Sequence, residues 1–256
     1  MRFRIACVLA SLVLASCTDA QDVTPTEAPS PASLPVAVVD GRALDAFSDD
    51  AEGDLQSWQG RPAIQSAIQA ARAHWSAQDP GYEEEVRVLS VAEGAFTRPG
   101  VAEQAVLYLM ARWPRCCPKV GLAIVEGDDL VRNVAFEGST HGVGSVPDLD
   151  GDGIEEVALL SSFGMGGDEE SSVVLLSLGD TLSGWAGAQV SASGCAAGRE
   201  QETAFSVTAE PGDPPTFTSE SFVRSCSGGA WEPGPGSEPL ALHPVASETY
   251  TLLPVE

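Results

Sequence analysis

The chain has 256 residues, of which 37 are acidic and 13 are basic, giving a formal net charge of −24 at pH 7. A surface this acidic repels phosphate backbones and anionic lipid headgroups while it attracts cations. The composition therefore excludes nucleic acid as a partner and favours cation binding.

The N-terminus predicts export. Arg2 and Arg4 precede an apolar run over residues 5–14, which is too short for a membrane-spanning helix of about 20 residues. Residues 1–16 are therefore expected to be a signal peptide. The sequence Leu14-Ala15-Ser16-Cys17 resembles the lipobox of bacterial lipoproteins, which implies cleavage before Cys17 and a lipid anchor on its thiol that holds the protein at a membrane. The alternative is an ordinary secretory signal with an incidental cysteine.

The residues after Cys17 predict a location and a tether. Thr18 stands where lipoproteins retained at the inner membrane have aspartate, so the resemblance implies the periplasmic or surface side of the outer membrane. Residues 17–36 are rich in proline, threonine and serine and have too few large apolar residues to offset the entropy of ordering, which predicts a disordered tether. Residues 37–256 should then form a single exported domain.

One segment has the pattern of an amphipathic helix. Residues 62–78 start with Pro62, which suits a first helical position, and place Ile64, Ile68, Ala71 and Trp75 on one face. That face should pack on a sheet.

Most of the remaining chain predicts strands. Short apolar or alternating runs recur between turn signals, at residues 86–91, 103–110, 121–125, 130–136, 156–160, 172–178, 189–193, 203–207, 216–223 and 240–242. We expect a mainly β fold, an antiparallel meander of blade-like hairpins arranged as part of a propeller or as a sandwich, with one N-terminal helix.

Four cysteines belong to the expected domain. Cys195 and Cys226 lie at corresponding ends of two expected strands, and outside the cytoplasm an even number of cysteines usually forms disulfides. We predict a Cys195–Cys226 bridge. Cys116 and Cys117 are adjacent, and would be joined to each other or free. Adjacent cysteines are poor tetrahedral ligands, which argues against zinc.

The segment Asp148-Leu149-Asp150-Gly151-Asp152-Gly153 places three aspartates at alternate positions before a glycine. If the chain curls at Gly153, the carboxylates of Asp148, Asp150 and Asp152 can converge on one cation, and calcium accepts six to eight oxygen ligands. An EF-hand would need a bidentate glutamate at the twelfth position, where Leu159 stands. The loop is therefore not an EF-hand.

This loop resembles the DxDxDG calcium loop of FG-GAP or VCBS-type repeats, the integrin-α kind. The resemblance implies that Ile154 provides its carbonyl, that Glu156 closes the site at the ninth position, and that the chain leaves as a strand. The Gly-Ala-Pro that follows this loop in the family is replaced by Leu160-Ser161-Ser162. We expect one structural calcium ion, because magnesium tolerates a flexible carboxylate cage poorly.

A degenerate second copy of this unit is suggested upstream. Residues 103–107 align with residues 155–159 at an offset of 52 positions (155 minus 103), but the aspartates are absent from the first copy. A period of this size is typical of repeat or blade-like β architectures.

No catalytic signature is found in the sequence, such as Gly-x-Ser-x-Gly or His-Glu-x-x-His. His141 precedes Asp148 by seven residues and could face the ion, or could be a turn residue. We expect no enzyme but a non-catalytic binding or structural module of the envelope, with an envelope protein or a polysaccharide as partner. The alternative is a calcium-dependent envelope hydrolase that uses His141.

Overall fold

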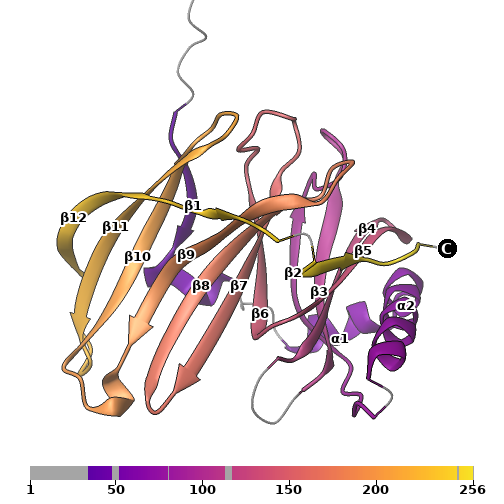
Figure 1. Cartoon of the computed structure of the whole chain (residues 1–256), viewed down its shortest axis with the longest axis horizontal. Helices are drawn as coiled ribbons and strands as arrows, with labels where there is room; N and C mark the ends of the chain where they lie inside the picture. The colour runs from indigo at the N-terminus through magenta and orange to yellow at the C-terminus, as the bar shows by residue number, and fades with distance from the viewer. Residues whose placement is uncertain (1–33, 48–51, 80, 113–116, 247, 256) are drawn as a thin grey trace, which may run out of the picture. The chain divides into compact units, whose positions relative to one another are not determined.

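The computed structural model describes residues 34–47, 52–79, 81–112, 117–246 and 248–255 (Figure 1). These residues belong to one compact unit, Ser33–Glu256. The expected signal peptide, Cys17 and most of the expected tether lie outside the described residues. Within the described ranges, no helix is both long and apolar enough to span a membrane.

The strands form two antiparallel sheets. The larger has nine strands in the order β12-β11-β10-β9-β8-β7-β6, with β1 and β13 pairing with β10 and β9. Its strands are β1 (Val36–Asp40), β6 (Thr140–Val146), β7 (Glu156–Met165), β8 (Asp168–Ser177), β9 (Ser183–Ser193), β10 (Gln201–Glu210), β11 (Thr216–Ser225), β12 (Glu232–Leu240) and β13 (His243–Pro244). The smaller sheet has the order β14-β5-β4-β3-β2. Its strands are β2 (Arg87–Gly94), β3 (Glu103–Ala111), β4 (Lys119–Glu126), β5 (Asp129–Glu137) and β14 (Tyr250–Leu252).

The expected fold class is confirmed, because consecutive strands pair as an antiparallel meander in both sheets. The expected helix is α2 (Pro62–Gln78), with the bounds that the sequence predicted. A second helix, α1 (Glu52–Gln59), and two short 3-10 segments, η1 (Gly41–Phe47) and η2 (Cys195–Ala197), were not predicted.

Helix α2 covers one face of the five-stranded sheet, as its apolar stripe predicted (Figure 1). Its buried residues share a core with Val106, Tyr108 and Met110 of β3. Two polar groups in this core also reach the helix backbone. The Asn133 amide donates to the Ala67 carbonyl at 2.9 Å, and the Tyr108 hydroxyl lies 2.8 Å from the side-chain oxygen of Asn133. These contacts fix the helix on the sheet.

The opposite face of the five-stranded sheet packs on the nine-stranded sheet. Residues of both sheets form one core, which includes Leu107 and Leu122 from the smaller sheet and Val157, Leu159 and Leu176 from the larger one. The fold is therefore a sandwich with a helix on its outer face. A third core lies on the remaining face of the nine-stranded sheet. There, Val38 and Val39 of β1 pack with residues of β7 to β10.

The sandwich brings two strand-to-strand loops together. The backbone amide of Val143 in β6 donates to the Ser90 hydroxyl of β2 at 3.3 Å. Beyond these strands, the amide of Glu155 donates to the carbonyl of Ala95 at 2.9 Å. The loop between β2 and β3 therefore contacts the loop between β6 and β7, which carries the aspartates.

Several strands differ from the prediction. Residues 240–242 were expected to form a strand, but Leu240 ends β12, and 241–242 belong to no strand. β12 contains three prolines, which are tolerated because this strand lies at the edge of its sheet. The prolines of residues 232–240 favour a loop over a strand, which is why β12 was not predicted.

Candidate metal site

The aspartate loop joins β6 to β7 and is closed by hydrogen bonds to Asp148. The amide of Gly151 donates to Asp148 Oδ1 at 2.7 Å, and the amide of Gly153 donates to Asp148 Oδ2 at 2.8 Å. Both glycines have φ near +85°, at 84° for Gly151 and 85° for Gly153, which favours glycine because it has no Cβ. The curl expected at Gly153 is present.

The loop brings three carboxylates together. One oxygen each from Asp148, Asp150 and Glu156 lie within 4.8 Å of one another, which is close enough to share a cation. Asp152 does not belong to this cluster, and its Oδ1 accepts the amide hydrogen of Ile154 at 2.8 Å. Three of the four expected side-chain ligands therefore converge, and Ile154 adjoins them with its side chain buried.

Glu156 is the unusual member of the cluster because it is fully buried, with 0% of its surface exposed. Its Oε2 accepts the amide hydrogen of Leu149 at 2.9 Å. Its Oε1 is also buried and has no hydrogen-bond partner within the described residues. A buried carboxylate oxygen without a donor is costly unless a cation or a proton is bound to it.

The electrostatics of the cluster favour a bound positive charge. Burial is the main cause that raises the pKa of Glu156 to about 8, and the neighbouring Asp150 and Asp148 contribute to this rise. Burial, with nearby Asp152, Asp148 and Asp213, also raises the pKa of Asp150. A divalent cation would offset this repulsion and allow the carboxylates to remain ionised.

Neighbouring turns hold the loop in place. The amide of Gly212, in the turn between β10 and β11, donates to the carbonyl of Leu149 at 2.8 Å. Gly179, between β8 and β9, lies so close that a Cβ there would be 3.1 Å from Ile154 Cδ1 and 3.6 Å from Asp152 Oδ2. The carboxylates are thus presented by a loop that is packed on its surroundings.

The β2–β3 hairpin, which contains the suggested upstream copy, can be compared with this site. Glu103 begins β3 as Glu156 begins β7, and both are 0% exposed. Glu103 Oε2 accepts the amide of Phe96, seven residues earlier, at 2.7 Å, as Glu156 accepts the amide of Leu149. The structural equivalence is therefore Glu103 with Glu156, an offset of 53 (156 minus 103). The alignment at 52 was wrong by one residue.

The two glutamates differ in how their second oxygen is satisfied. Glu103 Oε1 accepts a hydrogen bond from the Thr97 hydroxyl, and its Oε2 also accepts the Thr97 amide at 2.8 Å. Glu156 Oε1 has no such donor among the described residues, and the Glu156 carboxylate clusters with Asp148 and Asp150 instead. The role of Glu103 was not predicted from the sequence, where aligning Glu103 with Glu156 would have indicated it.

His141 does not lie beside the cluster. It follows Thr140, which pairs with Ser161, whereas Val146 at the other end of β6 pairs with Glu156. Five residues of strand separate His141 from Val146, which corresponds to about 16 Å. The histidine and the carboxylates are therefore at opposite ends of the hairpin.

The predicted disulfide is confirmed. Cys195 and Cys226 are bonded, with their Cα atoms 5.5 Å apart. The bridge joins the segment after β9 to the segment after β11. Cys117 is exposed, and Cys116 lies outside the described residues.

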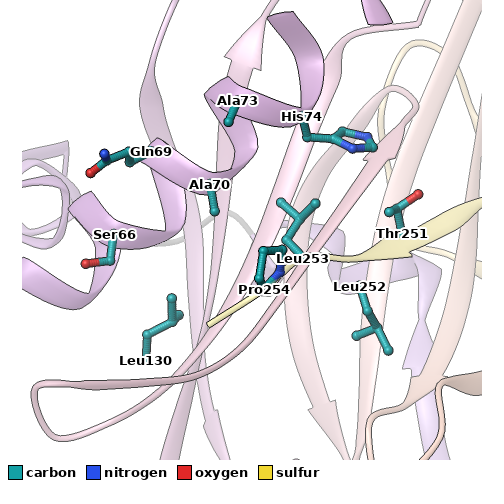
Figure 2. Close-up of a pocket in the computed structure, with 10 residues that line it drawn as sticks. All are labelled: Ser66, Gln69, Ala70, Ala73, His74, Leu130, Thr251, Leu252, Leu253 and Pro254. Atoms are coloured by element: carbon teal, nitrogen blue, oxygen red, sulfur yellow. The ribbon is translucent and has the colours of Figure 1, made fainter. Parts of the chain in front are cut away.

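The smaller sheet also has an apolar groove of about 490 Å³, which lies between α2 and the residues around β14 (Figure 2). Its lining residues are Ser66, Gln69, Ala70, Ala73, His74, Leu130, Thr251, Leu252, Leu253 and Pro254. Burial, with Lys119 nearby, lowers the pKa of His74, which favours its uncharged form. The groove therefore presents mostly apolar surface.

Comparisons of the chain with protein-family models, with curated proteins and with solved structures found no match. The resemblance to FG-GAP or VCBS-type repeats rests on the residues of the loop.

Proposed function

We propose that this chain is a lipid-anchored protein of the bacterial envelope whose β unit is a non-catalytic binding module stabilised by one calcium ion. The observation that carries the proposal is the buried Glu156 carboxylate, which clusters with Asp148 and Asp150 and has one oxygen without a hydrogen-bond partner among the described residues. A cation at this point would satisfy that oxygen and neutralise three adjacent acids.

Calcium suits the cluster better than magnesium. Calcium accepts six to eight oxygens in flexible geometry, whereas magnesium requires near-ideal octahedral coordination. The clustered carboxylates of Asp148, Asp150 and Glu156 can supply three of these oxygens, so calcium would need further ligands. The FG-GAP-like pattern suggests Asp152 and the Ile154 carbonyl for these positions, together with water.

The anchor is supported by the N-terminal sequence. A short apolar run ends in Leu14-Ala15-Ser16-Cys17, and lipid on Cys17 would hold the unit at a membrane through the tether. The disulfide is consistent with an oxidising compartment outside the cytoplasm. The periplasmic or surface side of the outer membrane is our proposed location.

A binding role is favoured over catalysis. A catalytic metal needs an open coordination position and a neighbouring acid, base or nucleophile. His141, the residue considered for that role, is about 16 Å along β6 from the end of the strand that adjoins Glu156. The calcium-dependent hydrolase therefore has no supporting contact among the described residues, and an envelope protein or a polysaccharide is the proposed partner class.

Thermal unfolding of the purified protein in calcium, in magnesium and in chelator tests the ion. We expect calcium to raise the midpoint by several degrees, since a ligand well above its dissociation constant contributes about 1 to 3 kcal/mol. Magnesium should have a smaller effect, and Asp150→Ala should abolish the calcium response. Asp128→Ala, in the exposed turn between β4 and β5, is the matched control and should respond like the unaltered protein. Equal midpoints in calcium and chelator would overturn the proposal.

A further inference from the structure

A polar cavity of about 380 Å³ lies on the nine-stranded sheet and shares no lining residue with the carboxylate cluster. One row of side chains crosses four strands along its floor. Glu169 of β8 pairs with Ser193 of β9, Ser193 pairs with Glu202 of β10, and Glu202 pairs with Arg224 of β11. Because residues directly opposite one another share a face of the sheet, these side chains form a continuous polar row.

A second row runs parallel to the first. Ser162 of β7 pairs with Ser171 of β8, which pairs with Ser191 of β9, and all three line the cavity. Ser171 and Ser191 are each two residues from a member of the first row, so both rows lie on the same face. The Ser162 and Ser171 hydroxyls are 2.8 Å apart.

The arginines of the cavity are already paired with acids. Arg42 binds Asp40, with a nitrogen-to-oxygen distance of 2.6 Å, and Arg224 binds Glu202. Their charges are therefore balanced locally. An anionic ligand would have to compete with these carboxylates and with the chain's net charge of −24. The cavity is consequently unsuited to phosphate or to acidic glycans.

The same groups suit a ligand that is rich in hydroxyls. Serine hydroxyls both donate and accept hydrogen bonds, carboxylates accept, and guanidinium groups donate. Trp231 adds an apolar ring to the lining, with the Arg224 guanidinium 4.3 Å from its centroid. A sugar presents hydroxyls around its ring and apolar C–H groups on its faces, which matches this combination. A purely apolar ligand would leave the serines and acids unsatisfied.

We propose that this cavity binds an uncharged oligosaccharide, with the two polar rows hydrogen-bonding its hydroxyls and Trp231 contacting a ring face. The inference deepens the binding function proposed above and rests on it. Neighbouring strands are about 4.8 Å apart, so a row over four strands can contact more than one sugar unit.

The disulfide holds the rim of the cavity in its binding geometry. Cys195 follows Ser193 by two residues, and Cys226 follows Arg224 by two. The amide of Cys226 also donates to the carbonyl of Glu200 at 2.9 Å. The rim is thus fixed before a ligand arrives, which lowers the entropic cost of binding.

The test is binding of the purified full-length protein, in calcium, to immobilised neutral glucans, galactans and mannans, with uronic-acid and sulfated glycans as charged probes. We expect a neutral glycan to be bound and the charged ones not to be. Trp231→Ala and Glu169→Gln should each weaken binding roughly tenfold. Trp58→Ala is the matched control, because Trp58 is also stacked by an arginine, with Arg61 at 3.5 Å, but lies outside this cavity.

Binding to no neutral glycan, preferential binding to a charged one, or unchanged binding by both cavity variants would overturn the inference. Because Glu169 is exposed, Glu169→Gln should not disturb folding. Its effect on glycan binding therefore tests the inference even if Trp231→Ala fails to fold. Calcium-dependent unfolding is measured on the same preparation. If calcium raises the unfolding midpoint but no glycan binds, only the glycan-binding inference is overturned. If a glycan binds but calcium does not raise the midpoint, only the proposed calcium site is overturned.

Discussion

At the scale of single residues, the contrast between Glu103 and Glu156 is the most informative feature. Both are fully buried at the start of a strand, and both accept a backbone amide seven residues upstream. Thr97 donates to Glu103 through both its amide and its hydroxyl, whereas Glu156 has Asp148 and Asp150 beside it. One carboxylate is therefore satisfied by protein alone, and the other requires a cation or a proton.

The raised pKa of Glu156, at about 8, predicts how stability depends on pH in chelator. The folded state holds a proton on Glu156 between the unfolded value of about 4.3 and this folded value. The free energy of unfolding should therefore fall, by on the order of a few kcal/mol, as the pH rises from about 5 to 8. Denaturant titrations at several pH values measure this slope.

Glu156→Gln should flatten that slope, because glutamine does not titrate. Glu137→Gln, at an exposed position at the end of β5, is the control and should keep the slope of the unaltered protein. A Glu156→Gln variant that shows the same pH dependence as the unaltered protein would remove Glu156 as its origin.

At the scale of elements, the β2–β3 and β6–β7 hairpins share one arrangement. Each places a loop before a strand that begins with a buried glutamate, and the loops touch through the Glu155 amide and the Ala95 carbonyl. The first loop relies on Thr97 for its internal contacts. The two hairpins should therefore respond differently to calcium.

Thr97→Val should destabilise the protein by about 1 to 3 kcal/mol, because it leaves an oxygen of the buried Glu103 without its donor. Calcium should not recover this loss. Thr97→Ser keeps the hydroxyl and should lie near the unaltered protein. Thr218→Val, in an exposed hydroxyl pair with Thr208, controls for the change of side chain. Recovery of Thr97→Val by calcium, seen in denaturant titrations, would show that the first loop also binds the ion.

At the scale of the whole molecule, the proposed organisation is a lipid anchor, a tether and one compact unit, Ser33–Glu256. The role of Cys17 can be separated from folding. Cys17→Ser should move the protein from the membrane fraction to the soluble fraction and abolish labelling by a radioactive fatty acid. The midpoint of unfolding should not change, since Cys17 precedes the unit. Cys117→Ser should remain membrane-bound and labelled. Retention of the label by Cys17→Ser would refute the anchor.

Features with strong local signals could be predicted from the sequence. Pro62 and the spacing of Ile64, Ile68 and Trp75 gave α2 its correct bounds, and alternating apolar residues identified most strands. β6, with two glycines among its seven residues, and the proline-containing β12 lack such signals. Their pairing depends on neighbouring strands, which only the tertiary structure supplies.

The sequence indicated which residues form the candidate metal site, but not how all of them are arranged. The alternate aspartates indicated a cation loop, and the structure brings Asp148 and Asp150 to Glu156. The separation of His141 from the loop follows from the extended conformation of β6, which its glycine-containing sequence does not indicate. The polar rows could not be predicted either, because they depend on the cross-strand pairing of Glu169 with Ser193 and of Glu202 with Arg224, which only the structure shows.

The pairing of β14 with β5 imposes an order on assembly. The Tyr250–Leu252 strand pairs with residues 134–136, and Leu253 enters the core beneath α2. During synthesis, β2 to β5 emerge long before β14 does. Until then β5 has an unpaired edge, which is prone to aggregation and attack by proteases. The smaller sheet is completed last, although its other four strands precede every strand of the larger sheet except β1 in the sequence.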